Sequence, residues 1–178
     1  MAPVCWLQNI MFNATGSVVK QKAGSKRLLD YEISCQNLKS GDLRVPVAAF
    51  LSNDHTVSTI SHFLRCFRDN EKKVFGYRYQ VQPCILKVYF SMALIISILE
   101  VFNIKKMQDY LKWCWLAVSN TKANTNIYTL VHVCLTHFMK RVKEHSSKLF
   151  KGGMEIILYS FSLMANSLDM LEVKQVSV

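Results

Sequence analysis

The stretch MFNATGSVVK, residues 11–20, sets the first expectation for the fold. An apolar segment, the word Asn-Ala-Thr-Gly and a second apolar segment follow one another, which predicts two strands joined by a tight bend at residues 13–16. Asn13 stands where the first strand ends. Many enzymes place a metal-binding carboxylate at such a position, so Asn13 is a turn residue, a working site or a site that has lost its charge.

Two more strands are predicted after this hairpin. LLDYEISCQN, residues 28–37, nearly alternates between polar and apolar, and LRVPVAAFLS, residues 43–52, follows a Ser-Gly-Asp turn signal. Pro46 lacks a backbone N–H, which indicates that the second strand lies at the edge of a sheet or begins there. The region 9–52 is therefore predicted to be rich in strands.

After residue 52 the apolar residues change to helical spacing. A helix is predicted over residues 54–69, with Asn53 or Asp54 as its N-cap. Residues 80–90 predict one more strand, and Ser91 stands near the start of the helix that follows it. Further helices are predicted at residues 107–119, 127–145 and 154–173, with a polar loop at residues 120–126.

This order of elements is typical of a ribonuclease H-like α/β domain. In that fold an antiparallel series of strands is followed by a helix and by a strand parallel to the first. One strand and the remaining helices then occupy residues 80–172. At 178 residues the chain is long enough for one domain with its own core, and we expect a single domain over residues 1–178.

The charge balance favours acidic partners. The chain has 22 Lys and Arg against 12 Asp and Glu, a formal net charge of +10, and 51% of its residues are hydrophobic. That composition is typical of a folded chain rather than a disordered one. The positive charge favours nucleic acid or an anionic membrane as a partner, and the alternative is a generic basic surface, since the charges are dispersed along the chain. The densest run, KRVKEHSSKLFK at residues 140–151, has two equal interpretations, contact with nucleic acid or a solvated helix face. Its basic residues are Lys140, Arg141, Lys143, Lys148 and Lys151.

The spacing of the cysteines and the length of the apolar runs predict the cellular compartment of the protein. Six widely spaced cysteines without a CxxC pair, and no clear secretion signal at the N-terminus, predict reduced thiols and a nuclear or cytoplasmic protein that is not secreted. The most apolar run, residues 88–102, is shorter than the ~20 residues of a membrane-spanning helix. We interpret it as a buried strand end that passes into a core helix, and we expect no membrane partner. The oligomeric state is left open.

Four words in succession resemble a known family. They are FNATGSVVK (residues 12–20), LLDYEISCQN with VPVAAFLSNDHTVSTISHFLRCF (within 28–67), FSMALIISILEVFN (90–103) and YTLVHVCLTHFMK (128–140). In this order they resemble the core of Mutator-like transposases of animal genomes, over residues 9–171. The resemblance implies a DDE-type ribonuclease H-like nuclease, in which carboxylates hold two divalent metal ions for phosphodiester chemistry.

The chain departs from that family at both acid positions that can be matched. The acid before Ala-Thr-Gly is Asn13 here, and the acid before Phe-Ser is Tyr89. A neutral amide holds a metal ion weakly, and a tyrosine hydroxyl keeps its proton at neutral pH. The third acid is expected on a later helix, beyond Val178, with Glu155 and Glu172 as the nearest carboxylates. The resemblance therefore implies an inactive, truncated domain whose metal site is lost.

Other acids are candidates to replace the lost charge. Asp30 and Glu32 share one face of a strand by period-2 alternation, but we interpret them as solvent-facing because charged side chains are mostly exposed. Glu100 lies in an apolar helix, and its position near the helix end, beside Asn103 and Lys105, explains its presence.

Two further clusters have a structural and a functional interpretation. A zinc site is conceivable on the ligands of HVCLTHFMK, which are His132, Cys134 and His137, although packing near the old active site is the alternative. Tyr110, Trp113 and Trp115 would suit base stacking. Their offsets do not form one helical face, so we expect core packing with one exposed aromatic.

The function expected from the sequence is that of a non-catalytic, transposon-derived protein with a ribonuclease H-like core. It would retain sequence-independent nucleic-acid binding through its basic surface. The alternatives are an inert protein-interaction module and a translated relic without a selected function. No cofactor is expected.

Overall fold

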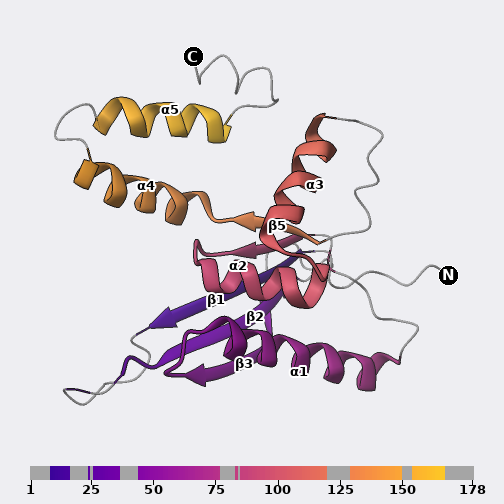
Figure 1. Ribbon diagram of the computed structural model, residues 1–178. Helices are drawn as coiled ribbons and strands as arrows, with labels where there is room; N and C mark the ends of the chain where they lie inside the picture. The colour runs from indigo at the N-terminus through magenta and orange to yellow at the C-terminus, as the bar shows by residue number, and fades with distance from the viewer. Residues whose placement is uncertain are drawn as a thin grey trace.

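The computed structural model describes residues 9–16, 24, 26–36, 44–76, 83, 85–119, 129–149 and 154–166. It is a mixed α/β structure in which a five-stranded sheet is combined with helices (Figure 1). The elements in chain order are β1 (Asn9–Gly16), β2 (Leu29–Gln36), β3 (Arg44–Ser52), α1 (Val57–Phe75), β4 (Ile85–Val88), α2 (Met92–Ile98), the π-helical turn η2 (Leu99–Asn103), α3 (Met107–Ser119), β5 (Leu130–Val133), α4 (Leu135–Leu149) and α5 (Met154–Asn166).

The sheet has the strand order β3-β2-β1-β4-β5. β2 runs antiparallel to both β1 and β3, whereas β4 runs parallel to β1 and β5 runs parallel to β4. The strands β1, β3, β4 and β5 therefore point in one direction, and their C-terminal ends lie along one edge of the sheet. We call this the C-terminal edge.

β1 continues through the word that predicted a bend, so that prediction is wrong. Residues 13–16 are extended and pair with β2, from Asn13 opposite Glu32 to Gly16 opposite Leu29. This ladder satisfies the backbone N–H and C=O groups that a turn would otherwise use, and its partner is distant in sequence. The predicted second arm of the hairpin, residues 17–21, lies outside the described residues.

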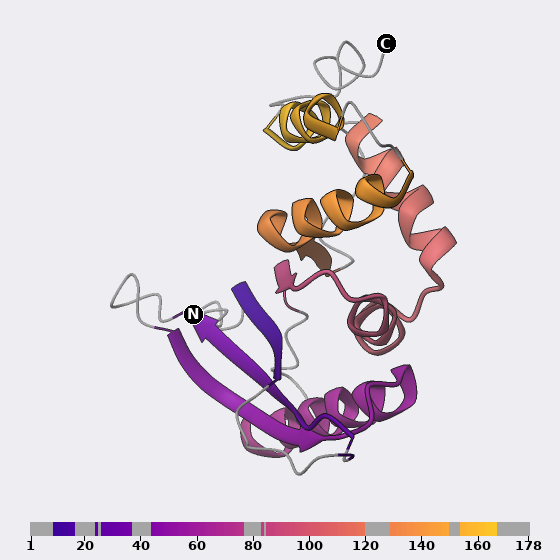
Figure 2. The same ribbon diagram turned by 90° about the vertical axis from the view of Figure 1, so that its left-hand side faces the viewer.

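Alternate residues of β1 face the core. Ile10 and Phe12 are almost fully buried, and Met11 and Asn13 belong by alternation to the opposite face of the sheet. α1 and α2 lie on the core side of the sheet (Figure 2). The buried core is made of apolar side chains from the sheet and the helices, namely Ile10, Phe12, Tyr31, Ile33, Ile60, Leu64, Leu86, Val88, Leu94, Ile95, Ile98, Leu99, Val101, Phe102 and Tyr110.

Most of the predicted elements are present. The strands predicted at residues 28–37, 43–52 and 80–90 contain β2, β3 and β4, and the predicted helices at 54–69 and 107–119 correspond to α1 and α3. The apolar run at 88–102 passes from the end of β4 into α2 and η2, as expected. The helix predicted from residue 154 is α5, described as far as Asn166.

The N-cap of α1 corrects the prediction of Asn53 or Asp54. Thr56 is the N-cap, and its side chain accepts a hydrogen bond from the Thr59 backbone N–H at 3.4 Å. Asp54 supports the cap from outside the helix, because its Oδ2 accepts hydrogen bonds from the hydroxyls of Thr56 and Thr59 at 3.0 and 2.5 Å. These hydrogen bonds lower the pKa of the Asp54 carboxyl group.

The helix predicted over residues 127–145 is a strand followed by a helix. β5 pairs in parallel with β4, from Leu130 opposite Ile85 to Val133 opposite Val88, and α4 begins two residues later at Leu135. The strand forms because β4 offers it a ladder, and four residues are too few to show a period of their own. The predicted loop at residues 120–126 lies outside the described part of the chain.

A buried asparagine fixes the entry to β5. The Asn103 side chain donates to the Thr129 carbonyl at 3.0 Å and accepts from the Thr129 N–H at 2.8 Å. Both residues are buried. The two hydrogen bonds join the end of η2 to the residue before β5, so the amide holds two segments that are far apart in sequence.

β3 forms one edge of the sheet, in agreement with the presence of Pro46. Ile33 pairs with Ala48 and Ser34 pairs with Pro46, so Val47 is an additional residue on β3 and forms a β-bulge.

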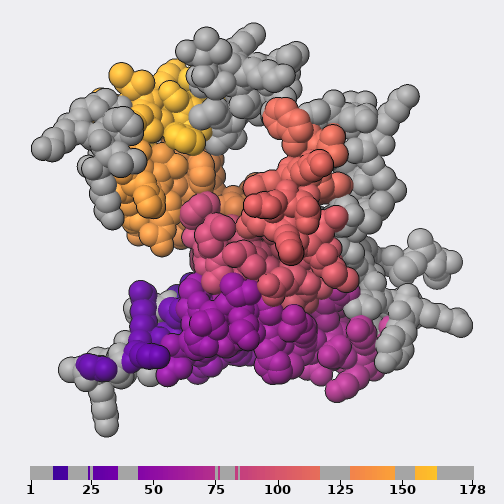
Figure 3. All heavy atoms as spheres, in the orientation of Figure 1, coloured from indigo at the N-terminus to yellow at the C-terminus, as the bar shows by residue number. Residues whose placement is uncertain are grey.

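The later helices extend away from the sheet. Figure 3 shows α3 and the α4–α5 pair standing apart, with a hollow between them. α4 and α5 contact each other through Phe138 and Phe161, whose ring centroids are 5.8 Å apart. Within the described ranges, every helix is too short or too polar to span a membrane.

Candidate functional site

Asn13 and Tyr89, the two positions where acids were expected, lie next to each other at the C-terminal edge. The last parallel pair between β1 and β4 is Phe12 with Val88, and Asn13 and Tyr89 are the residues immediately after it. Asn13 belongs to β1, the central strand of the sheet, and Tyr89 directly follows β4, the parallel neighbour of β1. The ends of adjacent parallel strands are a common location for ligand sites in open α/β sheets.

Two more polar residues lie beside Asn13 and Tyr89, one on each side, across the sheet. Glu32 of β2 is the direct partner of Asn13. Cys134 follows Val133, the partner of Val88, and its backbone N–H donates to the Val88 carbonyl at 2.8 Å. One row of side chains therefore crosses β2, β1 and the ends of β4 and β5. We call it the edge row, and it consists of Glu32, Asn13, Tyr89 and Cys134.

The edge row carries little negative charge. Asn13 contributes a neutral amide, and its Oδ1 is buried without a hydrogen-bond partner among the described residues. Tyr89 contributes a phenol. Glu32 supplies a carboxylate, and Asp30 lies two residues along the same face of β2, opposite Thr15. Two-metal phosphoryl chemistry uses several anionic oxygens around the ions, whereas the two central positions of this row are uncharged.

The other acids that could replace the lost charge lie on different elements. Asp30 and Glu32 share one face of β2, as predicted, and both are half-buried instead of fully solvent-facing. Glu100 is exposed on η2 and accepts a hydrogen bond from Ser61 Oγ at 3.0 Å. Glu155 is exposed in the first turn of α5. Glu172 lies outside the described residues.

The histidine–cysteine cluster is brought together in part. His137 Nδ1 lies 3.2 Å from Cys134 Sγ, and the His137 ring packs on Tyr89 with centroids 3.9 Å apart. His132 is exposed on β5, opposite Lys87. The described part of the chain contains no group of three or more His, Cys, Asp or Glu side chains placed to share a metal ion. His137 thus links α4 to the edge row through one ring contact and one sulfur contact.

A hydrogen-bond chain at the same edge could not be predicted from sequence. The Tyr31 hydroxyl bonds to Nδ1 of His55, and Nε2 of His55 lies 2.9 Å from Ser91 Oγ. These partners are 24 and 36 residues apart in sequence, so no local motif indicates them. The chain joins β2, the segment before α1 and the N-cap of α2.

Burial shifts the pKa values of two members of this chain. Burial, and secondarily the charge of Asp54, raise the pKa of Tyr31 to about 12, so its hydroxyl keeps its proton at neutral pH. Burial lowers the pKa of His55, which Asp54 partly opposes. A phenol can donate to Nδ1 or accept from it, so the tautomer of His55 sets the direction of both hydrogen bonds.

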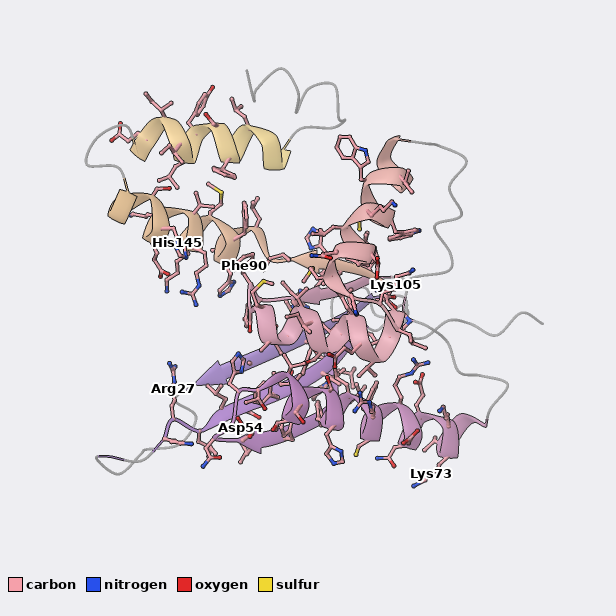
Figure 4. All side chains as sticks on the ribbon, in the orientation of Figure 1. Arg27, Asp54, Lys73, Phe90, Lys105 and His145 are labelled. Atoms are coloured by element: carbon pink, nitrogen blue, oxygen red, sulfur yellow. The ribbon has the colours of Figure 1, made fainter. Side chains whose placement is uncertain are left out.

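The basic run maps to α4. Lys140, Arg141 and Lys143 are exposed, and Arg141 forms a salt bridge with Glu144 at 2.9 Å. Lys148 is in α4, but its side chain and Lys151 lie outside the described part. His145 of α4 and Arg27, which precedes β2, lie on the same side of the molecule in Figure 4.

The aromatic residues of α3 pack as expected. Tyr110 is buried and its hydroxyl accepts from the Val131 N–H at 2.8 Å. Trp113 packs against the core, and Trp115 is 55% exposed. These residues form no common stacking platform.

No model of a known protein family matches this sequence, and no characterised protein or solved structure is significantly similar to it.

Proposed function

We propose that this chain is a ribonuclease H-like domain of the Mutator-like transposase type that does not catalyse phosphodiester chemistry and instead contacts nucleic acid independently of sequence. Asn13 and Tyr89 stand in for the acids that would hold divalent metal ions. The basic residues of α4 supply the contact with phosphates.

The strand arrangement supports the fold assignment. Three antiparallel strands, a crossover helix and two further strands parallel to the first give the order β3-β2-β1-β4-β5. This is the order expected of a ribonuclease H-like sheet. The resemblance of four sequence words to Mutator-like transposases implies the same fold.

The observation that carries the proposal is the position of Asn13 and Tyr89. Both follow the Phe12–Val88 pair between the central strand β1 and its parallel neighbour β4, where the acids of such a nuclease are expected. One is an amide and the other a phenol. A pair of uncharged groups at adjacent positions supports loss of metal-dependent cleavage more strongly than one substitution would.

The charge distribution supports contact with nucleic acid. The net charge is +10, and Lys140, Arg141 and Lys143 are exposed on one helix. Phosphate contacts of this kind are independent of sequence and release counterions, so binding should fall steeply with salt.

A protein-interaction module is the second candidate, and exposed apolar side chains favour it. On α3 these are Leu111, Trp115 and Leu116, and on α5 they are Ile156 and Tyr159. A translated relic is the third candidate, and a cooperative thermal transition of the isolated chain would count against it.

Two measurements test the proposal. Binding of the full chain to a labelled duplex, followed by fluorescence anisotropy from low to physiological salt, should show an affinity that falls steeply. Absence of binding at low salt contradicts the nucleic-acid part. Cleavage of a nicked or plain duplex in Mg²⁺ or Mn²⁺ should not occur. Cleavage that disappears in Glu32→Gln contradicts the non-catalytic part.

A further inference from the structure

We propose that one surface of this chain binds single-stranded nucleic acid in preference to duplex. This surface consists of Tyr89, His137, Lys140 and Arg141, and we call it the stacking face. The inference rests on the proposed function, because it names the form of nucleic acid that the basic surface takes.

The two rings form the aromatic part of the stacking face. Tyr89 and His137 have centroids 3.9 Å apart with planes at 48°, and both side chains keep part of their surface exposed. The contact joins the end of β4 to the first turns of α4. Tyr89 is thereby held at the sheet edge by a neighbouring ring.

The helix sets the basic residues beside these rings. Lys140 and Arg141 follow His137 by three and four positions, so they lie about one turn further along the same side of α4. Both are exposed. Lys143 is six positions from His137, and its direction around the helix axis differs by more than a right angle. An aromatic pair followed one turn later by two cations is therefore present along a single side of α4.

This combination suits a single strand better than a duplex. The bases of a single strand can turn outward and stack on aromatic rings while Lys and Arg follow the phosphates. In a duplex the base faces are already stacked on one another, so it can use the cations but gains nothing from the rings. The expected preference comes from Tyr89 and His137, and the shared affinity comes from Lys140 and Arg141.

Glu144 limits the affinity of this surface. It follows His137 by seven positions on the same side of α4 and pairs with Arg141 at 2.9 Å. The pair is exposed, and such pairs contribute little, so Arg141 can exchange the carboxylate for a phosphate. Glu144→Gln should strengthen binding of single strands and duplexes alike.

Removal of the Tyr89 ring should leave α4 attached. A second aromatic contact, Phe90 with Phe138 at 5.8 Å between centroids, also joins the end of β4 to α4. Figure 4 shows Phe90 close to α4. Tyr89→Leu keeps an apolar side chain of similar reach, and Tyr89→Phe keeps the ring itself.

The experiment compares one labelled oligonucleotide as a single strand and as a duplex, by fluorescence anisotropy with the full chain at low salt. We expect tighter binding of the single strand. Tyr89→Leu should weaken single-strand binding about 10-fold, a typical effect of losing one stacking ring, and leave duplex binding unchanged. Tyr89→Phe should bind like the wild type. Trp115→Leu, which removes an exposed ring from α3, is the matched control and should change neither affinity.

The charged variants provide a second readout. Lys140→Ala should weaken both forms and reduce the slope of log affinity against log salt by about 0.7 for the single strand and about 0.9 for the duplex. Thermal unfolding of each variant establishes that it is folded, and His137→Leu replaces Tyr89→Leu if the latter is not.

Equal or tighter binding of the duplex overturns this inference while the basic-surface proposal stands. The same is true if Tyr89→Leu and Trp115→Leu bind the single strand equally well. Absence of binding to both forms at low salt overturns the inference and the nucleic-acid part of the proposed function together.

Discussion

Glu32 and Asn13 are direct partners across the antiparallel ladder of β2 and β1. The edge row thus holds one carboxylate beside one amide, followed by the phenol of Tyr89. The neutral amide of Asn13 is compatible with the carboxylate of Glu32, because it adds no charge repulsion.

Asn13→Asp should create a site that responds to divalent metal ions. Without metal, the new carboxylate stands opposite Glu32, and like charges in cross-strand pairs destabilise a sheet by roughly 0.2–1 kcal/mol. In EDTA the Tm should therefore be lower than that of the wild type. Addition of Mn²⁺ should raise the Tm of the variant more than that of the wild type, because an ion that binds the folded state stabilises it.

The control for this experiment is Asn13→Asp combined with Glu32→Gln, which should lose the response to Mn²⁺. Equal thermal shifts in the single and double variants would show that the two positions do not share an ion.

Asn103→Leu should strongly destabilise the fold. It removes two hydrogen bonds to the Thr129 backbone and leaves a buried N–H and C=O without partners. Each unsatisfied buried group costs roughly 1–3 kcal/mol. Urea unfolding should show a lower midpoint. Gln108→Leu, an exposed position on α3, is the matched control, and a midpoint for Asn103→Leu equal to that of the control would contradict the role of this amide.

Ile104→Gly should stabilise the protein. Ile104 has φ 52°, in the left-handed region, and is 86% exposed. A β-branched residue in this conformation costs roughly 1–2 kcal/mol, whereas glycine adopts it freely. The gain is reduced by the greater entropy of glycine in the unfolded chain, so we expect an increase of up to about 1 kcal/mol in the unfolding free energy. An unfolding free energy that decreases would show that the Ile104 side chain makes a contribution beyond its backbone conformation.

Stability should fall below about pH 6.5 because of His55. Burial lowers its pKa in the folded state, while in the unfolded chain the pKa is near the ordinary value of about 6.5. Above that value the ring is neutral in both states. As the pH falls from about 6.5 toward the lower folded pKa, the unfolded state binds the proton first, so the folded state loses stability.

His55→Gln keeps a side-chain hydrogen-bond donor and does not titrate. Urea midpoints at pH 7.5 and 5.5 should therefore differ more for the wild type than for His55→Gln. An identical difference in the two proteins would remove His55 from the account of acid sensitivity.

The elements that sequence predicted have local causes. β2 and β3 alternate between polar and apolar, α1 and α3 carry apolar residues at helical spacing, and Pro46 indicates an edge. Each of these signals is contained within the element itself. The bend predicted at residues 13–16 failed because its backbone pairs with β2, and local turn preference does not include that partner.

β5 was missed for a related reason. Its strand conformation depends on β4, from which it is separated by α2, η2 and α3. Four residues with apolar character fit a helix or a strand equally well.

Some features of the candidate site were predictable from sequence, and others were not. The adjacency of Asn13 and Tyr89 was predictable only through the family resemblance, because nothing in the composition relates them. The chain from Tyr31 through His55 to Ser91 joins three segments and has no motif. The contact between Cys134 and His137 was predictable, because the two residues are three positions apart, with Cys134 directly before α4 and His137 in its first turn.

Pro46 and the β-bulge at Val47 affect whether β3 can pair with a strand of another molecule. An exposed edge strand can template the addition of another strand, and Val45, Val47 and Leu51 make this edge partly apolar. Pro46 removes one donor from the ladder, and the extra residue Val47 puts the next groups out of register for a regular incoming strand. The apolar edge is thereby protected against strand-by-strand aggregation, although its side chains remain in contact with water.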